Sequence, residues 1–129
     1  MKITGLDHIT INAKDLAQSE KFYTDVLLLE KTGFIDMGDH TLTYFPLPQG
    51  VRLELIDYTD KAAAEDIRET DTGIYRHFCL VTDSLSELYD SCKEKSVFVR
   101  KTPSYVEKLK AHTMLITDPN GVEIEIIQK

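Results

Sequence analysis

Two stretches of the chain each begin with a histidine and continue with apolar residues typical of a strand. Residues 8–12 (His-Ile-Thr-Ile-Asn) have the two-residue period of a strand with one buried face, and residues 77–81 (His-Phe-Cys-Leu-Val) match them 69 positions later as a more continuous apolar run. The halves also end alike, because residues 50–55 (Gly-Val-Arg-Leu-Glu-Leu) return 71 positions later as residues 121–126 (Gly-Val-Glu-Ile-Glu-Ile). The sequence therefore predicts two copies of one module.

Both histidine strands lead into predicted helices. Asp15 stands three residues before Gln18, and Ser84 stands three before Glu87, which is the spacing of a capping box. The apolar stripe after Ser84 has a clear helical period, whereas that of the first half is looser. The rest of each half predicts three short strands, near 31–36, 41–48 and 51–57 in the first half and near 97–100, 112–117 and 122–128 in the second.

These elements predict an α+β fold made of two βαβββ modules about a pseudo-twofold axis. We expect one domain over residues 1–129, with module one at about 1–59, a linker at about 60–72 and module two at about 73–129. The charged stretch at 60–69 is expected to be a solvated linker or a short helix.

Composition narrows the classes of partner and the location. The chain has 42% hydrophobic and 29% charged residues, and no apolar run approaches the roughly 20 residues that cross a bilayer. The net charge is −7 with scattered basic residues, so we expect no nucleic acid and no membrane partner. An anionic small molecule stays possible, because Arg52 and Arg76 could bind it.

No secretion signal marks the N-terminus, and Cys79 and Cys92 fit free thiols buried as small hydrophobes, so a cytoplasmic location is expected.

Four side chains recur at equivalent positions of the two halves: His8, Glu54, His77 and Glu125. Strand alternation puts each one on the face opposite its apolar neighbours. A lone glutamate or histidine of this kind is usually solvated or packed, but chance does not predict two matched pairs. The N₂O₂ set suits one divalent metal, Zn²⁺, Ni²⁺, Co²⁺, Fe²⁺ or Mn²⁺, with open positions for water or substrate.

Other acidic and histidine side chains are weaker candidates for metal ligands. Glu123 shares a face with Glu125, but the glycine register matches Glu125 to Glu54. His40 and His112 have no counterpart in the repeat, so we interpret them as surface or core residues.

These residues resemble the vicinal oxygen chelate superfamily, which includes glyoxalase I, methylmalonyl-CoA epimerase, extradiol dioxygenases, and fosfomycin- and bleomycin-resistance proteins. The resemblance rests on residues 7–11 leading to 15–16 and 22–23, on His77 before a second helix, and on residues 118–125 (Asp-Pro-Asn-Gly-Val-Glu-Ile-Glu). It implies an open barrel-like sheet around a cup with a metal in it. It also implies a homodimer, in which modules of two chains can complete each site.

A glutamate on the last strand of the first half resembles glyoxalase I and the epimerases more than the dioxygenases. The resemblance implies a lyase or isomerase that acts on a small α-hydroxycarbonyl or hemithioacetal-type metabolite by proton transfer through a metal-bound enediolate. Glu125 is then the general base, and Glu54 the second ligand or partner base. Asn12 and Tyr58 replace an arginine and an asparagine of the glutathione-using enzymes, so lactoylglutathione is not the expected product. Leu28-Leu29 also replaces the usual Leu-Gly after the first helix.

Two alternatives stay open. An iron-dependent dioxygenase of the same superfamily would consume O₂ with Fe²⁺ and would not need Glu54. A non-catalytic module of the antibiotic-resistance type would bind its ligand without metal, in a cup lined by aromatics such as Tyr44, Phe45 and Tyr58.

Overall fold

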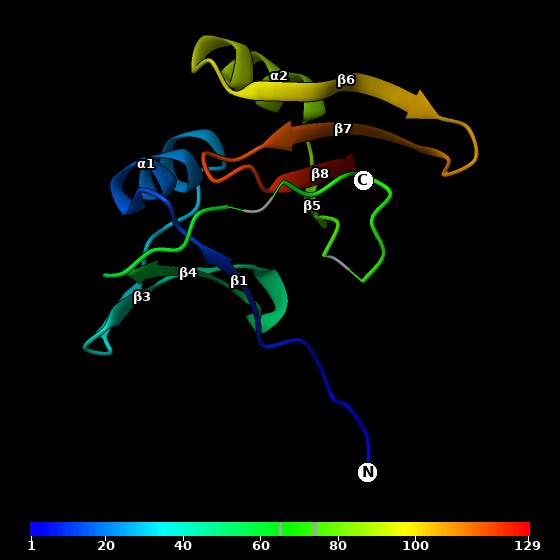
Figure 1. Cartoon of the computed structure of the whole chain (residues 1–129). Coiled ribbons are helices and arrows are strands. Elements are labelled where there is room, and N and C mark those ends of the chain that lie inside the picture. The colour runs from blue at the N-terminus through cyan, green and yellow to red at the C-terminus, as the bar shows by residue number, and fades with distance from the viewer. Residues whose placement is uncertain (65, 74) are drawn as a thin grey trace. The chain divides into compact units, whose positions relative to one another are not determined.

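The computed structural model of the chain describes residues 1–64, 66–73 and 75–129. It divides into two compact units, Met1–Lys61 and Ala62–Lys129, which are seen in Figure 1. Both have the element order strand, helix and three strands, so the predicted α+β fold with two βαβββ modules is confirmed. No helix among the described residues is long and apolar enough to cross a bilayer.

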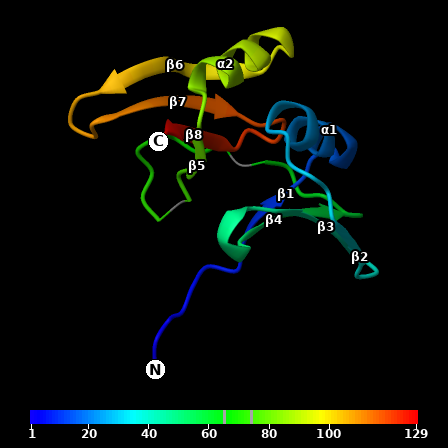
Figure 2. The ribbon, with the colours of Figure 1, turned by 180° about the vertical axis from the view of Figure 1, so that it is seen from behind.

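The first module is a four-stranded sheet with helix α1 (Leu16–Lys21) on one face. Its strands are β1 (His8–Asn12), β2 (Gly33–Asp36), β3 (His40–Pro46) and β4 (Arg52–Tyr58), in the order β1-β4-β3-β2. β1 runs parallel to β4 and the other pairs are antiparallel; Figure 2 shows β2 at the sheet edge. The side chains of the helix-covered face form the core, among them Ile11, Phe45, Leu53 and Leu55.

Helix α1 begins where the sequence predicts, because the Asp15 carboxylate accepts a hydrogen bond from the Gln18 backbone N–H at 3.0 Å. The chain then widens into a π-helical segment, Phe22–Val26 (η1). This wider turn explains the looser apolar stripe of the first half, since a π-helix breaks the 3.6-residue period. The segment ends at Val26, and Leu28, two residues further on, has a left-handed φ of 54°.

The second module repeats this plan with a longer helix. Its strands are β5 (Phe78–Thr82), β6 (Phe98–Val106), β7 (Ala111–Thr117) and β8 (Glu123–Gln128), in the order β5-β8-β7-β6, with α2 (Leu85–Glu94) on one face. Ser84 caps α2 by accepting from the Glu87 N–H at 3.4 Å. Gln128 of β8 accepts from the Leu85 N–H at 2.9 Å, which joins the helix start to the sheet.

Two details differ from the predictions. β6 is much longer than the expected 97–100 and passes through Pro103, which an edge strand tolerates because register shifts interrupt its ladder with β7. Cys79 is exposed rather than buried, since strand alternation turns it away from the helix, while Cys92 is buried as expected. Of the two expectations for the 60–69 stretch, its described part fits the linker, because no helix or strand forms there; residues 65 and 74 lie outside the described residues.

Candidate functional site

Glu54 lies on the face of the first sheet opposite the core. The register pairs Thr10 with Glu54 and Tyr44 with Glu54, so three neighbouring strands present these side chains together. The Glu54 side chain is nearly buried, at 6% exposed, and the Thr10 hydroxyl donates to its Oε1 at 3.0 Å. The Tyr44 phenol is also hydrogen-bonded to Glu54, which raises the pKa of Tyr44. Glu54 is therefore a carboxylate held in a fixed orientation.

His8 begins the neighbouring strand and pairs with Arg52, two residues before Glu54 on the same face. Its Nδ1 lies 2.7 Å from Asp7 Oδ2, and the Arg52 guanidinium donates to the same oxygen at 2.8 Å. Hydrogen bonds from His8 and then Arg52 lower the pKa of Asp7. Because Asp7 binds Nδ1, the Nε2 atom of His8 is the candidate ligand atom.

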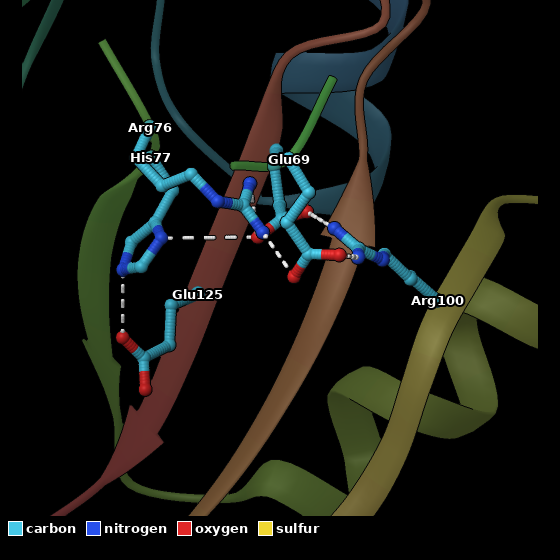
Figure 3. Close-up of polar contacts among 6 residues, drawn as sticks. Glu69, Arg76, His77, Arg100 and Glu125 are labelled. Carbon is cyan, nitrogen blue, oxygen red and sulfur yellow. Dashed lines mark hydrogen bonds and ion pairs between the residues drawn. The ribbon is translucent and has the colours of Figure 1, made fainter. Parts of the chain in front are cut away.

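His77 and Glu125 come together directly in the second module (Figure 3). His77 Nε2 lies 3.0 Å from Glu125 Oε2; His77 directly precedes β5, and Glu125 belongs to the neighbouring parallel strand β8. The Nδ1 atom of His77 is buried without a hydrogen bond to the described residues, 3.8 Å from Glu123 Oε1. A carboxylate thus lies at each edge of this imidazole.

Glu123 belongs to a ring of ion pairs that the sequence did not reveal. Its carboxylate contacts Arg76 at 2.9 Å and also contacts Arg100. Both arginines contact Glu69 as well, as Figure 3 shows. Two guanidiniums contact the Glu123 carboxylate, whereas the Glu125 carboxylate contacts the imidazole of His77. This difference supports Glu125 over Glu123 as a metal ligand.

The ion pairs beside the two histidines are equivalent but inverted in charge. Asp7 precedes His8 and binds Arg52 of β4 at 2.8 Å, and Arg76 precedes His77 and binds Glu123 of β8 at 2.9 Å. The same two positions of the repeat therefore form an ion pair in both modules, with acid and base exchanged. The two modules therefore share this ion pair, although the residue types at the two positions differ.

The donors present fit a divalent metal by their chemistry. Each module carries one imidazole and one carboxylate on the sheet face away from its helix, and nitrogen and oxygen donors of this kind bind Zn²⁺, Ni²⁺, Co²⁺, Fe²⁺ or Mn²⁺. Within the described residues, no three His, Cys, Asp or Glu side chains form a single metal-binding group. The donors shown are thus two pairs, one in each module.

The remaining histidines lie in other surroundings. His40 Nδ1 contacts Asp39 at 2.6 Å, and its ring packs against Tyr58. His112 faces the helix side of the second sheet and packs against Tyr105. There it lines an open groove of about 480 Å³ with residues of α2, β6 and β8, namely Leu85, Ser86, Tyr89, Thr102, Pro103 and Gln128.

Comparison with known proteins identifies the family of the chain. A model of the Glyoxalase/Bleomycin resistance protein/Dioxygenase superfamily matches residues 5–126, and the chain belongs to this superfamily. The predicted resemblance is thereby confirmed. No curated protein matches the chain.

Solved structures share the fold at low sequence identity. A glyoxylase/bleomycin resistance protein/dioxygenase domain from Frankia sp. EAN1pec is 17% identical, with a TM-score of 0.81 and coverage of 98% of each chain. The trypanothione-dependent glyoxalase I of Leishmania major is 23% identical, with a TM-score of 0.75 over 98% of this chain and 87% of that one. Glyoxalase I from Zea mays is 21% identical, with a TM-score of 0.79 over 96% of this chain and 44% of that one.

Proposed function

We propose that the protein is a metal-dependent lyase or isomerase of the glyoxalase I type. It would act on a small α-hydroxycarbonyl or hemithioacetal-type metabolite by moving a proton between adjacent carbons. The observation that supports this proposal is the histidine and glutamate pair at equivalent positions of both modules, within a superfamily that includes glyoxalases. The substrate and the reaction are both part of the proposal.

His8, Glu54, His77 and Glu125 would hold one divalent metal. When bound, the metal would polarise the substrate oxygens and stabilise the negative charge that develops during proton removal. The contacts of this chain prepare the ligands: Asp7 orients His8, and the hydroxyls of Thr10 and Tyr44 orient Glu54. Such supporting contacts fix the ring or carboxylate before the ligand binds.

Glu125 is the proposed general base. Its side chain contacts His77 and is 21% exposed, so it can move toward a substrate proton. Glu54 is more buried and holds two hydroxyl donors, which favours a role as ligand and second carboxylate in the transfer. The two glutamates therefore have different proposed roles, although they occupy equivalent positions in the repeat.

Metal analysis of the protein purified without chelator tests this assignment. We expect a stoichiometric metal in the wild type and its loss in Glu54→Gln and Glu125→Gln, with Glu107→Gln as an exposed control that keeps it. Activity on α-hydroxycarbonyl substrates should follow the metal, and Glu125→Gln should abolish proton exchange of substrate with solvent. A wild type without metal would refute the proposal and favour the binding module.

The alternatives predict different results in the same experiment. A dioxygenase would consume O₂ with Fe²⁺ and keep activity in Glu54→Gln. The binding module was predicted to have a cup lined by Tyr44, Phe45 and Tyr58. Phe45 does not belong to this lining, because it is buried against Tyr23 in the core, whereas Tyr44 and Tyr58 lie on the face of Glu54.

We also propose that the protein is a cytoplasmic homodimer, as members of this superfamily frequently are. Light scattering after size exclusion should give twice the chain mass of 14.7 kDa. A monomeric mass at micromolar concentration would contradict the dimer.

A further inference from the structure

The two carboxylates in the ring of ion pairs have different structural roles. Glu123 comes from β8, and its side chain is 9% exposed. Glu69 comes from the irregular segment before β5, and its side chain is 60% exposed. Glu123 is thus a fixed part of the sheet, while Glu69 is a carboxylate brought to the arginines from outside it.

Glu69 is bound as a carboxylic acid ligand would be. Arg76 donates to its Oε1 at 3.1 Å, and Arg100 donates to its Oε2 at 2.6 Å, so each guanidinium takes one oxygen (Figure 3). Hydrogen bonds from Arg100 and then Arg76, with their positive charges, lower the pKa of Glu69. Two arginines that share one carboxylate are the arrangement that proteins use to recognise anions.

We propose that Arg76 and Arg100 form the binding site for a carboxylate of the substrate, and that Glu69 occupies this site until the substrate displaces it. The inference rests on the proposed function, because it names the substrate class of the same site. The substrate is a small acid that carries a carboxylate besides its hydroxycarbonyl group.

The position of the arginines fits a group attached to the reacting part of the substrate. Arg76 is adjacent to His77, and Glu123 lies two residues from Glu125 on the same face of β8, a separation on the order of 7 Å. One small molecule can therefore reach both the arginines and Glu125. A neutral hydroxycarbonyl compound would leave the arginines bound to Glu69.

The charge of the site favours a carboxylate over a phosphate. Without Glu69, two guanidiniums face one Glu123 carboxylate, which leaves one net positive charge. That charge matches a carboxylate monoanion and falls short of a phosphate dianion. The net charge of −7 for the whole chain also disfavours a doubly charged ligand.

The test is a titration of the chelator-treated full-length protein with propionate, followed by NMR of the arginine Nε–H groups. Glu69→Ala should bind propionate about three- to tenfold more tightly than the wild type, because the internal competitor is gone. The control Glu107→Ala removes an exposed acid outside the ring and should match the wild type. Propionamide, which has no charge, should not shift the Arg76 and Arg100 signals.

Equal propionate affinity in Glu69→Ala and wild type would overturn the inference, and tighter binding of methyl phosphate would overturn the carboxylate assignment. The titration needs no metal, so its outcome is separate from that of the metal analysis. A metal-free wild type whose arginines still bind propionate would refute the proposed function alone. A metal-loaded wild type without a propionate site would refute this inference alone. In the active enzyme, Glu69→Ala should lower KM for acidic substrates.

Discussion

Tyr44 provides a quantitative test of how Glu54 is held. Tyr44→Phe removes one hydroxyl donor from a carboxylate that is 6% exposed. A hydrogen bond to a charged group contributes about 1.5–3 kcal/mol, and one to a neutral group about 0.5–1.5 kcal/mol. Because the Tyr44 ring is half-buried, the lower end of each range applies. The expected loss in the free energy of unfolding is therefore about 1.5 kcal/mol in the wild type and about 0.5 kcal/mol in Glu54→Gln.

Urea denaturation of the four proteins in this double-mutant cycle, in chelator at neutral pH, measures the difference. We expect a coupling energy of about 1 kcal/mol between Tyr44 and the charge of Glu54. Tyr105→Phe alters an exposed phenol in the other module and should change stability by less than about 0.5 kcal/mol. A coupling energy below about 0.3 kcal/mol would show that the phenol does not bind the carboxylate, and the account of Glu54 would be wrong.

Three further predictions concern other contacts. Asp7→Asn should weaken metal binding by about 10- to 100-fold in chelator competition, whereas Asp39→Asn, which alters the acid beside His40, should not. Leu28→Gly should raise the free energy of unfolding by about 0.5 kcal/mol in urea, because the 82% exposed leucine has a left-handed φ; a loss would contradict this reason. Glu69→Gln should lower the Tm at about pH 7, and this difference in Tm should shrink as the pH falls. The pKa of Glu69 is held below its ordinary 4.5, so its stabilisation is present above that value and lost as pH falls through the lower folded-state pKa; calorimetry in which the difference stays constant with falling pH would refute it.

The elements that the sequence predicted well depend on local signals. Asp15 and Ser84 accept hydrogen bonds from the first turns of their helices, and such contacts need only neighbouring residues. Strand alternation likewise fixed the faces of Leu53 and Glu54, because the register of β4 with both neighbours is regular. The second half of β6 was missed because Pro103 is usually a strand breaker and the bulges that accommodate it depend on β7.

The candidate site was predictable only where the repeat supplied a comparison. The pair of His77 and Glu125 follows from equivalence with the first half, and the structure brings these two side chains into contact. The roles of Arg100 and Glu69 could not be predicted, since their contact joins residues 31 positions apart through an irregular segment. Neither residue has a counterpart that would have drawn attention to it.

The exchanged acid and base beside the histidines limit how the halves can be recombined. In a chain built from two copies of the second half, a glutamate would replace Arg52 and an arginine would replace Asp7. The ion pair would form only if both residues were exchanged together. Moving one member alone would set two like charges against each other next to an imidazole. The two halves therefore carry the same ion pair with opposite polarity, and neither member of a pair can be exchanged between the halves alone.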